Sequence, residues 1–160
     1  MPEMTTKRIC IFRKCLLQYR ANELHRKEKI IVDRHVQELK NPFFDYNHMR
    51  ITAMGTDYAA AELMVVEESC NIYGRVHGGA FCTLGDNTAG CAACSSGKLY
   101  VTQTVSMHFI GNVEVGHRVR AEARVRHRGR TTCLVDVNFL DENSQLLAIG
   151  TYTFFCIDGR

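Results

Sequence analysis

The chain has no hydrophobic run long enough to cross a membrane as a helix. Such a span needs roughly 18 consecutive apolar residues, and the apolar stretch from Ile9 to Leu17 is interrupted by Arg13 and Lys14. Residues 1–20 also lack the apolar core and the small-residue cleavage site of a secretory signal. Their basic character would suit an organelle-targeting segment, but Glu3 and the short length argue against one. We therefore expect no membrane partner and a cytoplasmic location.

The chain also has no strong excess of charge of either sign. It carries 20 Lys and Arg against 17 Asp and Glu, a net charge of +3 with its seven histidines neutral. A nucleic-acid-binding surface would need a basic patch interleaved with aromatic residues. The arginine-rich stretch 118–130 contains no aromatic residue, so we expect no nucleic-acid partner. The length of 160 residues, 46% of them hydrophobic, is typical of a single globular domain.

The eight cysteines lack the companions of a metal site. Cys91 and Cys94 have the spacing of a ligand pair, but there is no second Cys-x-x-Cys and no His-x-x-x-His to complete it. We favour buried packing for this pair over a redox or metal role, and the same holds for Cys82, Cys133 and Cys156. Free thiols fit a reducing compartment. We expect no metal and no cofactor.

Alternation of apolar and polar residues is the strongest pattern that is present. It predicts four strands, at about 101–109, 118–126, 132–139 and 146–157. In the first strand, one face would carry Val101, Gln103, Val105, Met107 and Phe109, and the other Thr102, Thr104, Ser106 and His108. An earlier strand is expected from Tyr58 to Glu68, and a helix rich in small residues from Gly78 to about Ser95.

This order of elements predicts an α+β domain in which one antiparallel sheet packs around a central helix. The edge strands of such a sheet invite pairing with a second copy, which gives a dimer and often a tetramer. We assign this domain to residues 41–160. Residues 1–40 precede it as an N-terminal extension, with an amphipathic helix from Ala21 to Lys40. Phe43, Phe44 and Tyr46 are expected to plug the core rather than to bind a ligand.

The helix start His77-Gly78-Gly79 is the first candidate functional feature. Backbone N–H groups at a helix start are unpaired and carry partial positive charge, and glycine lets a ligand approach them closely. Such a start can hold an anion, including the oxyanion of a polarised acyl group. Asp86, inside the same helix, is the candidate nucleophile or base.

The spacing of these residues predicts a site shared between two subunits. Asp86 lies eight residues beyond Gly78, which is about 12 Å along a helix. One chain therefore cannot bring its own Asp86 to its own Gly78. A second copy of the helix, antiparallel to the first, would bring the helix start of one subunit to the acid of the other.

This chain resembles the PaaI-like hotdog-fold acyl-CoA thioesterases. The resemblance covers about residues 41–157 and rests on Asn71, His77-Gly78-Gly79, Asp86 and a strand that begins Val101-Thr102. It implies the hotdog fold, a curved antiparallel sheet around a long central helix. It also implies hydrolysis of a small aromatic or short- to medium-chain acyl-CoA, with coenzyme A as part of the substrate.

The resemblance assigns a role to each motif residue. The N–H of Gly78 would be the oxyanion donor, and the partner subunit's Asp86 would attack the thioester or activate water. Asn71 would contact the thioester or orient the nucleophile, or else cap its loop. His77 would hold its loop or contact the sulfur, and Thr102 would position the water or Asp86. Gly79 would secure the turn and face the substrate.

The coenzyme A phosphates are expected at a basic turn. The resemblance places them near Gly129-Arg130-Thr131, and arginine forks such as that of Arg128 suit phosphate oxygens. The alternative for these arginines is a solvated strand face.

Two other functions remain open at this point. The first is a non-catalytic acyl-CoA-binding regulator, which the presence of Asp86 argues against. The second is a hotdog hydratase or dehydratase, whose acid–histidine pair lies in a different local motif from His77-Gly78-Gly79.

Overall fold

The computed structural model describes residues 41–158, so the predicted extension and its helix lie outside the described residues. A short helix α2 (Pro42–Tyr46) is followed by strands β1 (Met49–Gly55) and β2 (Tyr58–Met64), a 3-10 turn η2 (Glu67–Ser69) and the long helix α3 (Gly78–Cys94). Four strands then follow, β3 (Tyr100–Phe109), β4 (Arg118–Arg128), β5 (Thr132–Leu140) and β6 (Leu146–Cys156). Within residues 41–158, no helix is long and apolar enough to cross a membrane.

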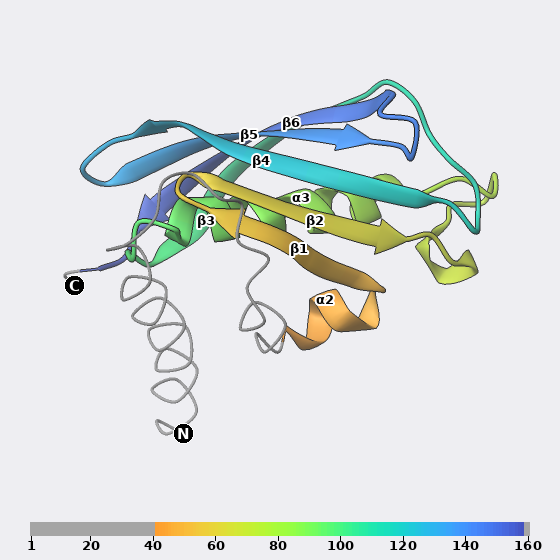
Figure 1. Ribbon diagram of the computed structural model, residues 1–160, viewed down its shortest axis with the longest axis horizontal. Helices are drawn as coiled ribbons and strands as arrows, with labels where there is room; N and C mark the ends of the chain where they lie inside the picture. The colour runs from red at the N-terminus through yellow and green to blue at the C-terminus, as the bar shows by residue number, and fades with distance from the viewer. Residues whose placement is uncertain (1–40, 159–160) are drawn as a thin grey trace.

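The six strands form one antiparallel sheet in the order β1-β2-β4-β5-β6-β3. Helix α3 lies along the concave side of this sheet and contacts all six strands (Figure 1). The predicted α+β architecture, a sheet wrapped around a central helix, is therefore confirmed.

The core lies between α3 and the inner face of the sheet. Period-2 alternation places Val119, Ala121 and Ala123 of β4 on this face, where all three are fully buried. Phe81 packs edge-to-face on Phe139 across the gap between helix and sheet, with ring centroids 5.5 Å apart.

Small residues let α3 lie close to the sheet. A Cβ added to Gly85 would come within 2.1 Å of the Tyr152 hydroxyl oxygen and 2.6 Å of a Phe139 ring carbon. The Tyr152 side chain is fully buried in the space left by Gly85. Glycine is therefore required at this position for packing.

The structure corrects four features of the predicted fold. The sequence reading missed β1, and the predicted strand from Tyr58 to Glu68 ends at Met64. Of the three aromatic residues at the start of the domain, Phe44 is buried, whereas Phe43 and Tyr46 are 64% and 81% exposed. They lie on α2, whose single turn presents only one side to the core.

The fourth correction concerns the two faces of β3. The pairing of β3 with β6 shifts between Thr102 and Thr104, at a bulge. Thr102 is opposite Phe154, and Val105 is opposite Tyr152; both partners are buried side chains. Because directly opposed residues share a face, the bulge puts Thr102 on the same helix-facing side as Val105. Strict alternation had put them on opposite faces.

Candidate active site

The start of α3 is capped by His77. Its Nδ1 accepts a hydrogen bond of 2.9 Å from the N–H of Gly79, and its carbonyl accepts from the N–H of Ala80 at 2.9 Å. Within residues 41–158, no acceptor is found for the N–H of Gly78. The edge of the Phe109 ring lies beside Gly78, 3.3 Å from where a Cβ would be. The helix start therefore offers one free backbone donor, at Gly78, next to an aromatic wall.

The loop before α3 is held by Asn71. Its Oδ1 accepts hydrogen bonds from the N–H groups of Tyr73 (2.9 Å) and Arg75 (3.3 Å), as in an Asx turn. Among the described residues, its Nδ2 has no acceptor. Asn71 thus acts as a loop cap in the single chain and still has both amide hydrogens available for a substrate.

Asp86 is held from the neighbouring strand. The hydroxyl of Thr102 donates a hydrogen bond of 2.6 Å to Oδ1 of Asp86. The bulge in β3 makes this contact possible, because it turns Thr102 toward α3. The carboxylate is half-buried, and its second oxygen has no partner among the described residues. One oxygen is oriented and the other remains available for chemistry.

Buried, protonated groups lie near Asp86. Burial, and then the charge of Asp86, raise the pKa of Cys82, which is one helical turn earlier. Burial chiefly raises the pKa of Tyr152 as well, and its hydroxyl donates to the sulfur of Met107 at 3.2 Å. A thioether is a weak acceptor. On this side, the carboxylate of Asp86 is therefore surrounded by uncharged side chains.

Asn41 and Asn87 form a further contact beside Asp86. This contact was not predicted from the sequence. The Nδ2 of Asn41 donates to Oδ1 of Asn87 at 2.5 Å, and Asn87 in turn donates to the carbonyl of Thr83. This bond joins the N-cap of α2 to the residue that follows Asp86. The two asparagines are 46 positions apart, and the sequence carries no signal that pairs them.

The predicted role of Arg128 in phosphate binding is not supported. Its guanidinium points under the sheet and donates to the carbonyl oxygens of Ala93 and Ala92, at the end of α3, and to the carboxylate of Asp57. Burial alone would lower the pKa of Arg128, but its hydrogen bonds with Asp57 and Tyr100 outweigh burial and raise it. Arg128 therefore stays charged and is occupied within the fold.

The turn that follows Arg128 remains open to solvent. Gly129 donates its N–H to the carbonyl of Thr132 at 2.8 Å, and the carbonyl of Thr131 accepts from Cys156 at 2.7 Å. Arg130 and Thr131 are exposed at the tip. Arg128 and Arg130 were both predicted to bind phosphate. In the structure, Arg128 is bonded within the fold, whereas Arg130 is exposed.

The other arginines of β4 lie on the outer face of the sheet and are largely paired. Arg126 binds Asp136 at 2.6 Å, and Arg120 lies 3.2 Å from Glu122. The guanidinium of Arg124 stacks over the ring of Tyr58. These contacts fit the solvated strand face that the sequence left as an alternative.

Cys91 and Cys94 are buried at the end of α3. Burial raises the pKa of Cys91 to about 12 and that of Cys94 to about 11. Protonated, enclosed thiols of this kind are packing residues. In the part of the chain that the structure describes, no group of three or more His, Cys, Asp or Glu residues is arranged to hold a metal ion.

Comparisons with known proteins bear on the family and the fold. Residues 73–148 match the family model of the thioesterase superfamily. In fold, the chain is similar to the Escherichia coli PaaI protein from the phenylacetic acid degradation operon, with a TM-score of 0.74, 19% identity and coverage of 92% of this chain and 97% of that one. The chain has the hotdog fold of the PaaI-like proteins.

Other relatives of this hotdog protein support the assignment. The acyl-coenzyme A thioesterase PaaI of Escherichia coli K12 is 25% identical over 99 residues, which cover 62% of this chain and 71% of PaaI. A hypothetical thioesterase protein of Streptococcus pneumoniae TIGR4, solved with coenzyme A, is 28% identical, covers 70% of this chain and 90% of its own, and has a TM-score of 0.67. A Streptococcus mutans protein bound to acetyl CoA is 28% identical, covers 77% and 96%, and has a TM-score of 0.69. Thioester hydrolysis is therefore the activity that the names of these relatives point to.

The Streptococcus pneumoniae protein offers one further parallel. Two more of its structures carry an alanine, one in place of an aspartate and the other in place of a threonine sixteen positions later. In this chain, Asp86 and Thr102 are also sixteen positions apart.

Proposed function

We propose that this protein hydrolyses the thioester of a small aromatic or short- to medium-chain acyl-CoA, in a site shared between two copies of the chain. The observation that carries the proposal is the arrangement along α3. The free N–H of Gly78 begins the helix, and the carboxylate of Asp86, held by Thr102, lies about 12 Å further along it. The two relatives solved with coenzyme A and with acetyl CoA support this substrate class.

The second copy follows from this separation. A donor and a nucleophile must both reach one carbonyl carbon, which needs them within a few ångströms of each other. An antiparallel copy of α3 brings the Gly78 end of one helix to the Asp86 of the other. Strand β3 is an edge of the sheet with exposed Val101, Val105 and Phe109, and its free backbone groups suit pairing with the same strand of a second copy. Two equivalent sites then form in each dimer, and pairs of dimers would form a tetramer.

The chemistry has two possible forms. In one, an oxygen of Asp86 attacks the thioester carbon, the oxyanion is stabilised by the N–H of Gly78, and the thiolate of coenzyme A leaves. Water then cleaves the mixed anhydride. In the other, Asp86 takes a proton from water, and the resulting hydroxide attacks directly. Both forms consume one water and release the free acid and coenzyme A.

Substitutions at Gly78 test the oxyanion donor. Gly78 is the first helical residue, a position where proline is well tolerated, and His77 before it has the extended conformation that a following proline requires (φ −66°, ψ 138°). Gly78→Pro removes the N–H, whereas Gly78→Ala keeps it and gives the same Cβ contact with Phe109. We expect free-thiol release from acyl-CoA to fall about 100-fold further in Gly78→Pro than in Gly78→Ala.

Substitution of Asp86 tests the reaction itself. Asp86→Asn should abolish release of coenzyme A from a panel of phenylacetyl-, benzoyl- and hexanoyl-CoA. Label found in the Asp86 side chain after a single turnover in ¹⁸O-water would show direct attack, because a general base takes up no oxygen from water. Saturable acyl-CoA binding without turnover in the unmodified protein would contradict hydrolysis and favour an acyl-CoA-binding regulator.

A further inference from the structure

Arg128 occupies an unusual place at the end of β4. The pairing of β4 with β5 shifts between Val125 and His127, and this bulge leaves Arg128 opposite the fully buried Cys133. Because opposed residues share a face, the bulge turns the Arg128 side chain inward. It then extends beneath the sheet to the last turn of α3.

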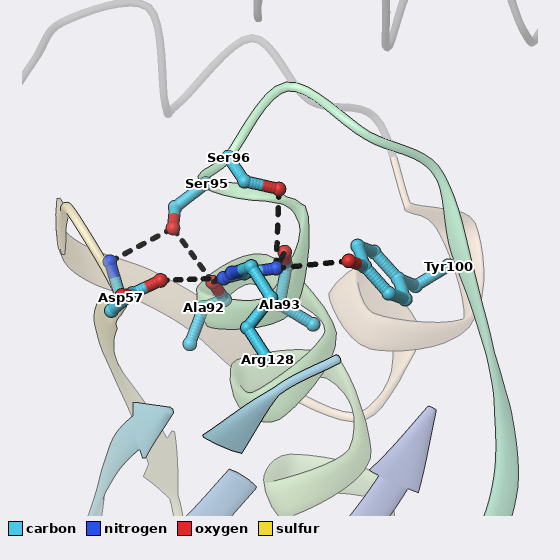
Figure 2. Close-up of polar contacts among 7 residues, drawn as sticks. All are labelled: Asp57, Ala92, Ala93, Ser95, Ser96, Tyr100 and Arg128. Carbon is cyan, nitrogen blue, oxygen red and sulfur yellow. Dashed lines mark hydrogen bonds and ion pairs between the residues drawn. The ribbon is translucent and has the colours of Figure 1, made fainter. Parts of the chain in front are cut away.

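The guanidinium joins three segments that are distant in sequence (Figure 2). Its Nη1 donates to the carbonyl of Ala93 at 2.7 Å, to Oγ of Ser96 at 3.1 Å and to the hydroxyl of Tyr100 at 3.2 Å. Its Nη2 donates to Oδ1 of Asp57 at 2.5 Å and to the carbonyl of Ala92 at 3.4 Å. The positive charge of the guanidinium also complements the partial negative charge at the C-terminal end of α3.

Asp57 is itself anchored on both sides. Its N–H donates to Oγ of Ser95 at 2.9 Å, and its carbonyl accepts from the N–H of Val125 at 2.9 Å. The turn between β1 and β2, the end of α3 and the end of β4 are thus fastened together around Arg128. A lysine, with one compact ammonium group, cannot bridge the same set of acceptors.

The exposed turn Gly129-Arg130-Thr131 begins at the next residue. The C-terminal end of the turn is fixed by the hydrogen bond from the N–H of Cys156 to the carbonyl of Thr131. The position of its N-terminal end therefore depends on the backbone of Arg128. Asp86 lies seven residues before Ala93, or about 10 Å along α3. The extended pantetheine arm of an acyl-CoA that reacts at Asp86 can span this distance to the turn.

We propose that Arg128 is a positioning residue for the coenzyme A moiety. It holds the turn Gly129-Arg130-Thr131 against the end of α3, so that the exposed guanidinium of Arg130 meets the nucleotide phosphates. The inference rests on the proposed acyl-CoA thioesterase function. Phosphate contact at this turn is what the family resemblance implies, and the new element is that Arg128 holds the turn in place.

The test compares two thioesters of the same acyl group. One is the acyl-CoA, and the other is the N-acetylcysteamine thioester, which has the same reacting atoms but no nucleotide. In Arg128→Lys we expect KM for the acyl-CoA to rise about fivefold or more, with kcat changed less than about twofold. KM for the short thioester should be unchanged. Arg130→Ala should give the same selective rise.

Arg126→Lys is the matched control, since Arg126 lies on the same strand but pairs with Asp136 on the outer face. It should leave both KM values unchanged. If Arg128→Lys does not fold, Asp57→Asn removes the charged acceptor of the same guanidinium and should give a weaker selective rise. An unchanged KM for the acyl-CoA, or an equal rise for both thioesters, would overturn the role of Arg128. Failure of the unmodified protein to hydrolyse either thioester would instead overturn the proposed function.

Discussion

Thr102 approaches Asp86 because β3 is irregular. Its hydroxyl lies 2.6 Å from Oδ1 of Asp86, in a contact that an evenly alternating strand would not allow. The bulge after Thr102 places one threonine hydroxyl on the helix-facing side, among apolar neighbours. The orientation of the candidate catalytic carboxylate therefore depends on one extra residue in an edge strand.

The first prediction concerns this hydrogen bond. Thr102→Val keeps the shape of the side chain but removes the donor, so the Asp86 carboxylate loses its orientation. We expect kcat/KM for the best acyl-CoA to fall about tenfold or more, which corresponds to about 1.4 kcal/mol. Thr102→Ser keeps the hydroxyl and should retain most of the activity. Equal activity of the valine and threonine proteins would show that Asp86 does not need this bond.

A second prediction separates the two roles of His77. Its Nδ1 caps the N–H of Gly79, and loss of an N-cap costs about 1 kcal/mol. His77→Ala should therefore lower the free energy of unfolding by about that amount, measured in urea. His77→Asn supplies another capping acceptor and should restore stability. If His77→Asn is as unstable as His77→Ala, capping is not the role of this side chain. If His77→Asn restores stability but its kcat falls, the second ring nitrogen of His77, Nε2, has a role in the chemistry.

The third prediction concerns the close contact between α3 and β6. A methyl group at Gly85 would collide with the hydroxyl of Tyr152, so Gly85→Ala should lower the free energy of unfolding by about 3 kcal/mol. Gly90, five residues later on the same helix, is the control, because a Cβ there would meet Phe154 at an ordinary 3.7 Å. Gly90→Ala should be neutral or stabilising by up to about 1 kcal/mol, as expected for alanine in a helix interior. Similar effects of the two substitutions would contradict the packing described here.

The fourth prediction is a pH dependence of stability. Burial raises the pKa of Cys91 from 9.0 to about 12, so the folded protein keeps a proton that the unfolded chain loses. The raised pKa of Cys91 should therefore leave the free energy of unfolding unaffected up to about pH 8 and lower it above about pH 9. Cys91→Ala should weaken this decrease, measured as urea unfolding at pH 8 and pH 10. An equally steep decrease in Cys91→Ala would place its origin in other groups.

Much of the fold could be predicted because its repeating patterns are long. The buried alternation of β4 and β5 and the small residues of α3 extend over enough positions to mark strand and helix. Strand β1 was missed because its pairing with β2 shifts between Ile51 and Ala53, which interrupts the alternation. Irregular pairing of this kind depends on the neighbouring strand and not on local sequence.

The candidate site could be predicted only where a local motif marks it. His77-Gly78-Gly79 and Asp86 stand on one helix, so their separation follows directly from the sequence. The inward turn of Arg128 could not be predicted, since it depends on a second bulge and on acceptors as distant as Asp57, 71 positions away. Nothing local distinguishes this arginine from Arg126, which faces outward.

The shared site is the central claim, and subunit complementation tests it most directly. Asp86→Asn and Gly78→Pro proteins, each inactive alone, are co-expressed with different affinity tags, and the acyl-CoA hydrolysis of the mixed population is measured. In each heterodimer, one site combines both substituted residues and the other combines an intact Asp86 with an intact Gly78. We predict that mixing restores about a quarter of the unmodified activity, because about half of the dimers are mixed and each has one working site of two. Mixed dimers that are recovered with both tags but remain inactive would contradict a site built from two subunits.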